Sequence, residues 1–513
     1  MTIGQTSDRI DVDVAIIGSG FVGSIIARLL AKKGRHVALI DRFGHPRFAI
    51  GESSTPAADA MLRLLADHYD EPLLRELSAW GSLRQSHPKL RCGPKRGFTY
   101  HDHRGVELGR GDSMLVAASA SDEVSDTHWC RADVDHLLFR HAIDAGVEDW
   151  TGWSIQSLQS EPFRHGRTSR CVAPFMTLTD QTGGSPQRMT ARHVIDASGR
   201  SAVTAKLLNA KSYVGRMRTQ TYAKFTHMTG VCCDLIPDHP GDPYPADAAA
   251  VHHLIGQRTW MWNLHLFDPS GLSVSDELSD RSDDQTITSV GVVSDRPVVR
   301  MDENIIVQRL LGGARLANVP GRWIDAGRVQ HWTSPITGPN VWSTPTAAAV
   351  IDPLHSTGIA HGLIGVAKLI QIVLQSDRGT NRQSDLIASY SDTLMREVQY
   401  LDRIVAATYR CMPDFTKFAD ACGLYLLSAI AFEEHLTNGT IDLDQPLRPA
   451  FGLHHRPLAE CVTRWCEEIA KDDGWSEKGN RRRSQMISEL EPYNEAGMFH
   501  RSDRRYAYTA TKK

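Results

Sequence analysis

The sequence predicts an α/β fold that begins with a parallel sheet of the Rossmann type and ends in a helical region. Three observations support this prediction. Within residues 14–41, a strand, a glycine-rich turn, a helix and a second strand follow one another. Residues 193–202 (HVIDASGRSA) give another short strand that ends in small residues. From about residue 376 onward, apolar residues recur at helical spacing.

The segment 14–41 has the order and spacing of a dinucleotide-binding unit. A short buried strand is expected over Val14–Ile17 and a helix over 22–33, followed by the strand HVALID, which ends at Asp41. A carboxylate at this distance can accept hydrogen bonds from a ribose hydroxyl. A glycine-rich turn in an unrelated sheet would leave Asp41 unexplained.

Between the first strand and the helix, Gly18, Gly20 and Gly23 form the pattern G-x-G-x-x-G. Gly18 allows the tight turn, Gly20 lets the backbone approach a pyrophosphate, and Gly23 lets the helix pack on the strand. The start of the helix adds N–H groups and the positive end of its dipole. We therefore expect a dinucleotide at this turn.

The composition of the 513-residue chain is that of a globular protein without a strong electrostatic field. Charged residues make up 23% and the formal net charge is −3, so neither nucleic acid nor a membrane surface is expected as a partner. The basic run Arg481–Arg483 has no interleaved aromatic residues and is interpreted as a solvated face. The first apolar run is cut by glycines, which argues against a signal peptide or a membrane span.

The cysteines favour a reducing, cytoplasmic location. There are nine, none spaced as CxxC, and Cys232 and Cys233 are adjacent, which suits neither a tetrahedral metal site nor an easy disulfide. No metal site is predicted.

The stretch after Asp41 distinguishes FAD from NAD. Residues 50–56 (IGESSTP) resemble the IGES-x-x-P run of the flavin-dependent halogenases, a branch of the flavoprotein monooxygenase fold. The resemblance implies FAD as the cofactor, with Arg47, Glu52 and Ser53 near the flavin.

Two later stretches agree with FAD. Residues 128–147 resemble the family's W-x-R-x-x-x-D-x-x-L helix, which implies that Arg131 contacts the cofactor, while Asp135 either caps or pairs locally or belongs to a surface ion pair. The strand that ends at Asp196, followed by Gly199, is similar to the turn that passes the adenine side of FAD.

The resemblance implies a domain organisation. An FAD-binding core is expected over residues 1–370, with substrate-side β segments at about 86–130 and 211–340 interleaved in it. Residues 371–513 are expected to form a helical region that covers the substrate side or contacts a carrier protein, with an irregular tail.

Halogenases differ from flavin hydroxylases in a lysine that relays hypohalous acid to the substrate. An ammonium group can hydrogen-bond this oxidant or hold it as a haloamine, and burial can tune its pKa. Residues 92–101 (CGPKRGFTYH) are similar to the family's K-x-G-x-x-aromatic stretch, which makes Lys95 the candidate, with Lys89 as a poorer match. A basic turn before a strand is the alternative interpretation.

A second halogenase feature is the pattern W-x-W-x-(I/L)-P, which narrows the space beside the flavin and disfavours monooxygenation. Here Trp260 and Trp262 match, whereas His265 stands in place of the proline; a strand at 289–293 follows, as in the family. Two tryptophans at this spacing could also be one face of an ordinary strand.

Residues 352–358 (DPLHSTG) match the family's D-P-L-x-S-T-G run. The resemblance implies that the N–H groups of Thr357 and Gly358 bind a halide near the flavin, with Gly358 supplying the required dihedrals and the next helix its dipole. Ser356 and His355 are the other candidate catalytic residues of this run.

Three departures from the pattern stand out. His355 replaces a glutamate of the tryptophan halogenases, which argues against free tryptophan as substrate; its imidazole could be a general base or could line the site. Pro345–Ala347 stands where the fold usually has Gly-Asp-Ala, and His265 is the third departure. They leave open an FAD-dependent monooxygenase or oxidase, or a flavin-binding protein without turnover.

The sequence thus predicts an FADH2-dependent halogenase that uses O2 and chloride or bromide. Because no second nucleotide fingerprint is visible, a separate flavin reductase is the expected source of FADH2. The substrate is expected to be a small aromatic or carrier-bound group, and neither its identity nor the oligomeric state is predicted.

Overall fold

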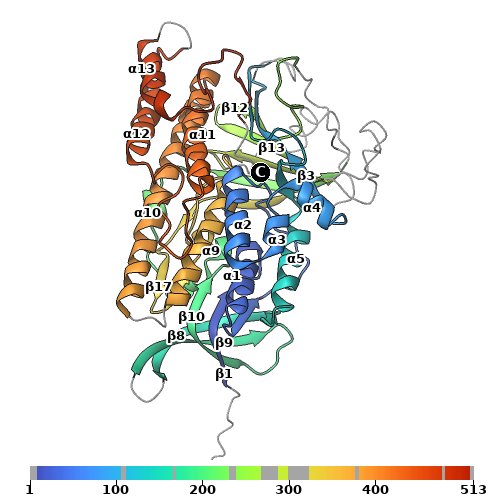
Figure 1. Ribbon diagram of the computed structural model, residues 1–513, viewed down its shortest axis with the longest axis vertical. Coiled ribbons are helices and arrows are strands. Elements are labelled where there is room, and N and C mark those ends of the chain that lie inside the picture. The colour runs from blue at the N-terminus through green and yellow to red at the C-terminus, as the bar shows by residue number, and fades with distance from the viewer. Residues whose placement is uncertain are drawn as a thin grey trace, which may run out of the picture.

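The computed structural model contains two large β-sheets and a group of long helices beside them (Figure 1). It describes residues 9–104, 111–165, 169–229, 231, 239–266, 287–297, 323–375, 380–476 and 480–508. Cys232 and Cys233 lie outside these ranges. Six cysteines are free thiols, namely Cys92, Cys130, Cys411, Cys422, Cys461 and Cys466. No group of residues suited to a metal ion occurs in the described part of the chain.

The first sheet holds the glycine-rich turn. β1 pairs in parallel with β2 on one side and with β10 on the other, as the predicted strand–helix–strand unit requires. The hairpin β8–β9 extends from β10. In sheet order, the strands are β17 (Ile336–Gly338), β18 (Val341–Ser343), β10 (Gln187–Asp196), β1 (Arg9–Ile17), β2 (Val37–Asp41) and β7 (Glu148–Thr151), with β8 (Trp153–His165) and β9 (Ser169–Asp180) beside β10.

The carboxyl ends of the parallel strands meet at one edge of this sheet. The Gly18 N–H donates to the Ile40 carbonyl at 2.7 Å and the Ala197 N–H to the Ile17 carbonyl at 2.8 Å. The turns after β1 and β10 therefore lie side by side at the end of β2, where a dinucleotide binds in such sheets.

The second sheet is formed by the segments expected on the substrate side. It is mostly antiparallel, except that β4 pairs in parallel with β12 and β5 with β20. In sheet order, the strands are β15 (Ile324–Arg328), β11 (Tyr222–Thr229), β14 (Ile287–Ser294), β13 (Thr259–Leu266), β12 (Ala250–Gly256), β4 (Gly97–Asp102), β5 (Ser113–Ala117) and β20 (Arg505–Tyr506). Two small pairs are β3 (Cys92–Lys95) with β6 (Asp126–Trp129), and β16 (His331–Trp332) with β19 (Ala349–Val350).

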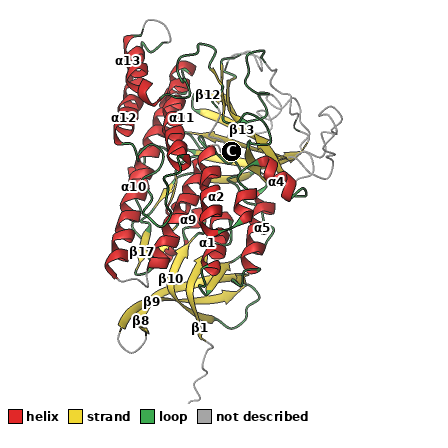
Figure 2. Cartoon of the chain, in the orientation of Figure 1, coloured by secondary structure: helices red, strands yellow, loops and turns green. Residues whose placement is uncertain are grey.

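The helices fall into an N-terminal set and a C-terminal set (Figure 2). The N-terminal set is α1 (Phe21–Lys32), α2 (Pro56–Tyr69), α3 (Pro72–Glu76), α4 (Trp80–Ser86), α5 (Arg131–Ile143) and α6 (Val203–Leu207), and α8 (Pro345–Ala348) precedes the long helices. The C-terminal set is α9 (Thr357–Gln375), α10 (Thr380–Cys411), α11 (Phe415–Thr437), α12 (Arg456–Lys471) and α13 (Arg481–Leu490).

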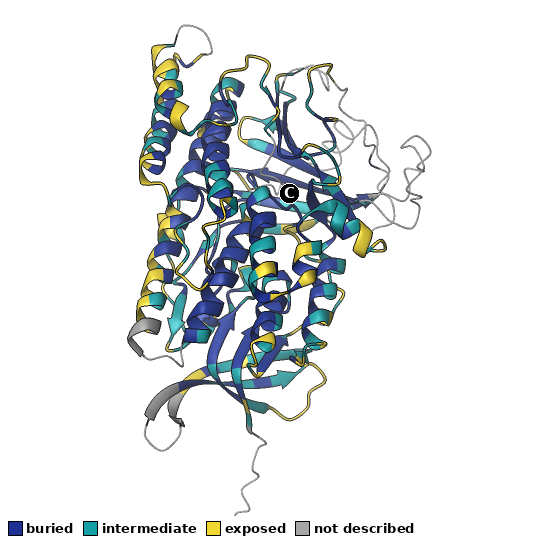
Figure 3. Ribbon diagram, in the orientation of Figure 1, coloured by how far each residue is buried: buried dark blue, intermediate teal, exposed yellow. Residues whose placement is uncertain are grey.

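Helices α9 and α11 are long and apolar enough to cross a membrane, but they are packed inside the protein (Figure 3). The most apolar stretch of α9 is 83% buried, and that of α11 is 78% buried. Packing against α2 and α10 therefore accounts for their apolar surface.

Three sequence expectations need correction. The expected boundary at residue 370 lies inside α9, which continues the core to Gln375. The C-terminal tail is not wholly irregular, because β20 joins the edge of the second sheet. The basic run is not simply solvated: Arg482 pairs with Glu468, and Arg483, whose side chain is 12% exposed, pairs with Asp420.

We expect Gly23→Ala to lower the free energy of unfolding by about 2–4 kcal/mol. The added Cβ would lie 1.9 Å from the Gly18 carbonyl oxygen, so the helix and the turn must separate. A Cβ added at Gly215 would lie in open space, which makes Gly215→Ala the matched control. Urea unfolding gives the free energy of unfolding of both variants. Equal values would contradict the close packing of α1 on the glycine-rich turn.

Candidate active site

The glycine-rich turn leaves the start of α1 open. Gly18 has a φ of +105°, and a Cβ there would lie 2.6 Å from the Ala197 carbonyl oxygen, so packing within the protein requires this glycine. Gly20 differs, because a Cβ there would make only an ordinary 3.4 Å contact with Asp135. As the N-cap of α1, Gly20 also provides no capping side chain. The space beside it suits an anionic group bound by the first N–H groups of the helix.

Two arginines approach the same helix start. Arg47 and Arg131 each place an Nη2 atom 4.0 Å from the Cβ position of Gly20. Arg47 also donates to Asp41 Oδ2 at 2.7 Å, and the Ser19 N–H donates to the same oxygen at 2.9 Å. The predicted pyrophosphate and ribose residues are thus brought together, with positive charge where phosphates would bind.

Arg131, the first residue of α5, forms hydrogen bonds to the IGES loop (residues 50–53), which continues as the GESS loop (residues 51–54). Its guanidinium donates to the carbonyls of Ile50 and Gly51 at 3.1 and 2.8 Å, and to both carboxylate oxygens of Asp135. Of the two interpretations of Asp135, the local pair is therefore the one observed. Arg131 holds the loop in place while its edge faces the glycine turn.

Glu52 and Ser53 carry buried polar atoms without a protein partner. Glu52 is 2% exposed; its Oε1 lies 2.6 Å from His227 Nε2, but its Oε2 has no hydrogen-bond partner. The Ser53 hydroxyl is also buried without a partner. Buried polar atoms are normally satisfied, so these two atoms are suited to hydrogen-bond a bound group beside the IGES loop.

Asp196 has a different role from the predicted one. Its Oδ1 accepts from the N–H and hydroxyl of Ser198, and its Oδ2 from the N–H and hydroxyl of Thr204, at 2.5–2.9 Å. The carboxylate is fully buried and occupied, so it shapes the turn and does not face a cofactor. Gly199 lies in this turn with a φ of +57° and open space beside it.

Lys95 is fully buried at the end of β3. Its Nζ donates to the Ser54 carbonyl in the GESS loop and lies 4.0 Å from the centre of the Phe98 ring. The opposite residue in the β3–β6 pair is the buried Asp126. A lysine is rarely buried without a hydrogen-bond acceptor or an aromatic ring beside its nitrogen, and Lys95 has both. The competitor Lys89 is exposed in the loop before β3.

His252 and Trp260 extend this region toward residues 352–358. His252, on β12, stacks between Tyr100 and Trp260 at ring-centre distances of 4.6 and 4.9 Å. Burial, with a contribution from the Lys95 charge, lowers the pKa of His252 to about 4. The imidazole is therefore neutral at pH 7, beside the lysine.

Trp260 connects to the loop through Tyr409. The Trp260 indole N–H donates to the Tyr409 hydroxyl at 2.7 Å, which donates to Asp352 at 3.2 Å. Asp352 also accepts from the Thr221 hydroxyl at 2.6 Å and from the Leu354 N–H at 3.0 Å. Burial raises the pKa of Asp352 to about 7. The first tryptophan of the W-x-W pattern thus positions the DPLHSTG loop.

His355 is buried against the C-terminal helices. Its ring stacks on Tyr425 with centres 4.0 Å apart, and neither ring nitrogen has a hydrogen-bond partner. Burial lowers the pKa of His355 to about 3. An imidazole with so low a pKa is a weak base at neutral pH, which favours the lining role over the general-base role.

The predicted halide residues begin α9. Thr357 and Gly358 belong to its first turn, where N–H groups have no acceptor within the helix. The left-handed dihedral belongs to Ser356, with a φ of +52°, and not to Gly358 as expected. Gly358 is exposed, and no protein atom lies within 4 Å of its Cβ position. Its lack of a side chain therefore leaves room for a ligand.

The other departures from the halogenase pattern are built into the core. His265, on β13, lies 3.0 Å from the Thr288 hydroxyl, and the Trp262 indole N–H donates to the Ser289 hydroxyl at 3.2 Å. Pro345 and Thr346 pack on α9 at Gly365 and Gly362, where added Cβ atoms would lie 2.1 and 3.7 Å away. The replacement of Gly-Asp thus serves helix packing in this chain.

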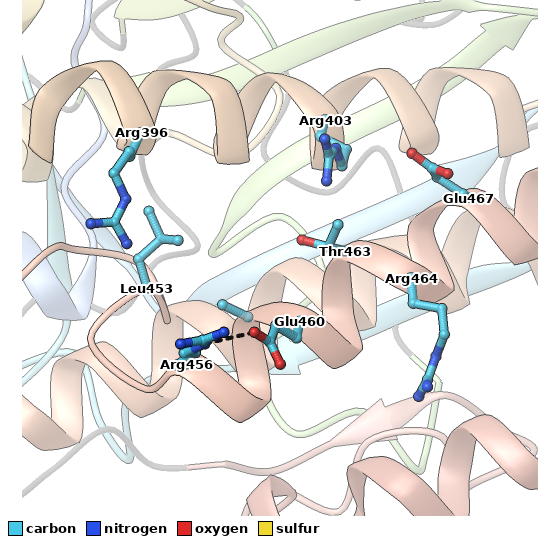
Figure 4. A pocket seen from close by; sticks show the side chains of 9 residues that line it. Arg396, Arg403, Leu453, Arg456, Glu460, Thr463, Arg464 and Glu467 are labelled. Carbon is cyan, nitrogen blue, oxygen red and sulfur yellow. Dashed lines mark hydrogen bonds and ion pairs between the residues drawn. The ribbon is translucent and has the colours of Figure 1, made fainter. Parts of the chain in front are cut away.

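A large groove lies elsewhere on the surface. It measures about 660 Å³ and lies between α10 and α12, where Arg396, Arg403, Arg456 and Glu460 line it (Figure 4). None of the predicted site residues lines this groove. It is therefore separate from the region around Lys95.

Known proteins similar to this chain include FAD-dependent oxidoreductases and halogenases. A family model described as FAD-dependent oxidoreductase matches residues 13–159. Tetracycline 7-halogenase of Kitasatospora aureofaciens is 28% identical over 373 residues, which cover 68% of this chain and 61% of that protein. Monodechloroaminopyrrolnitrin halogenase of Pseudomonas fluorescens is 26% identical over 416 residues, or 79% and 68% of the two chains. The chain is thus similar in sequence to known halogenases.

A solved structure shares the fold of this chain along nearly its whole length. The halogenase PltM, in complex with phloroglucinol and FAD, superposes with a TM-score of 0.78 at 21% identity, covering 96% of this chain and 99% of that one. The match with tetracycline 7-halogenase, by contrast, spans about three fifths of that protein.

Several residues of the candidate site were not predicted from the sequence. His252, Tyr409, Tyr425 and Thr221 belong to no short motif and come from three distant parts of the chain. Only the long-range pairing of β12 with β4 and the packing of α10 and α11 bring them to Lys95 and the DPLHSTG loop. An aromatic residue at helical spacing gives no local sign of such a role.

We expect the chain to lose stability steeply as the pH falls from 6.5 to 4. Burial lowers the pKa of each of six histidines to about 3 or 4, so the unfolded state binds more protons in this range. Burial also lowers the pKa of His128 and His253 well below its usual value. Asp352 and Glu434, with their raised pKa values, offset about two of these protons. The expected slope is about 4–8 kcal/mol per pH unit. The six residues are His101, His103, His252, His265, His355 and His454.

The measurement is urea unfolding at several pH values. His355→Phe should reduce the slope by about 1.4 kcal/mol per pH unit, because one titrating group is removed. The exposed His239, replaced by Asn, is the matched control and should leave the slope unchanged. A stability independent of pH between 4 and 6.5 would show that these imidazoles are not buried as neutral groups.

Proposed function

We propose that this chain is a halogenase that uses reduced FAD, oxygen and chloride or bromide to halogenate an electron-rich organic substrate. The observation that carries the proposal is the fully buried Lys95 ammonium, between the GESS loop and Phe98. A contact path through His252, Trp260 and Tyr409 joins its surroundings to the candidate halide loop.

The described residues fit FAD. The open N-terminus of α1 with Arg47 and Arg131 would hold the pyrophosphate, and Asp41 the ribose. The unpartnered Glu52 Oε2 and Ser53 hydroxyl would bond the flavin side. When bound and reduced, the flavin supplies the activation of oxygen.

The remaining steps fall to this chain's own groups. The N–H groups of Thr357 and Gly358 hold the halide at the positive end of α9. Lys95 donates to the oxidised halide and directs it to the substrate, while burial excludes water that would dilute or quench it. The neutral His355 and Tyr425 form an apolar wall beside this path.

The names of the relatives support an aromatic substrate. Two are halogenases named after tetracycline and monodechloroaminopyrrolnitrin, and the PltM structure holds phloroglucinol. We expect a separate flavin reductase to supply reduced FAD, and a cytoplasmic location. His355 in place of the glutamate disfavours free tryptophan.

Lys95→Met should abolish bromination while FAD stays bound. A positioned proton donor contributes about 10²–10⁴-fold to a rate, so a loss of that size is expected. The exposed Lys89 provides the matched control, Lys89→Met, with unchanged activity. Mass spectrometry of phenols, pyrroles and indoles, incubated with a flavin reductase, NADH, air and bromide, detects the bromine isotope doublet. Products that gain oxygen with or without bromide would instead indicate a monooxygenase.

Gly358→Ala should raise the KM for bromide by about tenfold or more, because the new methyl group fills the space of the halide. The thermal stability of this variant should not fall, since the added Cβ has open space and alanine favours a helix more than glycine does. Gly362→Ala in the same helix is the contrast: its Cβ would lie 2.8 Å from Val22, so stability should fall. An unaltered bromide KM for Gly358→Ala would remove Gly358 from the halide site.

A further inference from the structure

The groove between α10 and α12 gathers arginine side chains in a chain whose net charge is negative. The formal net charge of the chain is −3, yet four arginines line this groove against two glutamates, Glu460 and Glu467. The groove volume of about 660 Å³ lies in the range of small-molecule sites, about 300–1,000 Å³. A local excess of positive charge attracts anions. The four arginines are Arg396, Arg403, Arg456 and Arg464.

Arg403 is the arginine of this groove whose hydrogen bonds are least satisfied. Its Nε atom is buried and has no hydrogen-bond partner among the described residues. Glu467, which lines the same groove, pairs with Arg218 at 3.2 Å. Arg403 can therefore bind an anion without first giving up a carboxylate partner. The other three arginines form the pairs Arg396–Asp392 at 3.6 Å, Arg456–Glu460 at 2.7 Å and Arg464–Glu489.

Arg396 and Arg403 are placed to bind the same ligand. They are seven residues apart on α10, so they share one face of the helix and lie about 10 Å apart along its axis. Figure 4 shows both side chains extending from α10 towards α12, where Thr463 faces Arg403. The side chains of Arg396 and Asp392 are 53% and 71% exposed, so their ion pair stabilises little and Arg396 can turn to a ligand.

The chemistry of the lining favours a phosphate group over a carboxylate or a docked helix. A phosphate ester has about two negative charges at neutral pH and three acceptor oxygens, enough for two guanidinium groups. The two oxygens of a carboxylate are engaged by one arginine. A docked helix needs a row of apolar anchors, whereas the apolar residues that line this groove are Leu453 and Ala459.

We propose that this groove binds a small organic phosphate. The phosphate group accepts hydrogen bonds from Arg403 and Arg396, and the carbon part of the ligand lies on Leu453 and Ala459. The residues assigned to halogenation do not line the groove, so the inference is independent of the proposed function.

The test is calorimetric titration of the FAD-loaded protein, in which the dinucleotide site is filled. The probe is butyl phosphate, and butanesulfonate, a monoanion with the same carbon chain, is its matched partner. At pH 8 and low ionic strength, butyl phosphate should bind with a Kd of about 0.1–1 mM. It should bind at least about tenfold more tightly than butanesulfonate, because the second charge engages the second arginine. Added salt should weaken its binding, since the groove is open to solvent.

Variants locate the binding site. Arg403→Gln should weaken the binding of butyl phosphate about tenfold or more, and Arg396→Gln about threefold. Arg403→Lys should have an intermediate effect, because lysine keeps the charge but not the planar fork. Arg481, at the start of α13, is exposed and does not line the groove, so Arg481→Gln is the control and should leave the affinity unchanged.

Three results would overturn the inference. They are equal affinity for the two probes, no binding of butyl phosphate up to about 10 mM, and an affinity that neither Arg403→Gln nor Arg396→Gln lowers. Tighter binding of a phosphoserine peptide than of butyl phosphate would also overturn it, because the groove would then belong to a phosphorylated protein.

Discussion

The structure depends on a buried ammonium group. Lys95 has no access to solvent. Its Nζ donates to the Ser54 carbonyl of the GESS loop and lies over the Phe98 ring, and Asp126 is the opposite residue in the strand pair. Burial of a charge is costly unless it is paired or hydrogen-bonded, so the surrounding residues must be held firmly. The order of the elements along the chain provides this support, because β3, which carries Lys95, the GESS loop and the second sheet meet at one place.

A polar path through the core joins the lysine region to the candidate halide loop. The groups along this path form hydrogen bonds or ring contacts with one another. They are the His252 imidazole with its lowered pKa, the Trp260 indole, the Tyr409 phenol and the Asp352 carboxyl with its raised pKa. Such a network fixes geometry without adding charge beside the ammonium. Tyr409 and Tyr425 come from the C-terminal helices, so these helices are part of the site and not merely a cover over it.

Local motifs predicted the dinucleotide unit well, because Gly18, Gly23 and Asp41 act within one strand–helix–strand segment. Lys95 and residues 352–358 were found by resemblance: Lys95 is buried, Thr357 and Gly358 begin α9, and the roles implied for them stay predictions. Two details differ from the expectation: the Asp196 carboxylate accepts from Ser198 and Thr204, and the left-handed dihedral belongs to Ser356 and not to Gly358. The places of His252 and Tyr409 could not be predicted, since only long-range packing brings them to this region.

We propose that a halide and Lys95 meet at one flavin site. A crystal structure of the protein soaked with FAD and bromide can show this, since bromide gives an anomalous signal. We expect a peak within hydrogen-bond distance of the Thr357 and Gly358 N–H groups, on the side of the flavin that faces Lys95. Well-ordered FAD with no bromide at the start of α9, or with bromide far from the lysine, would rule out such a site.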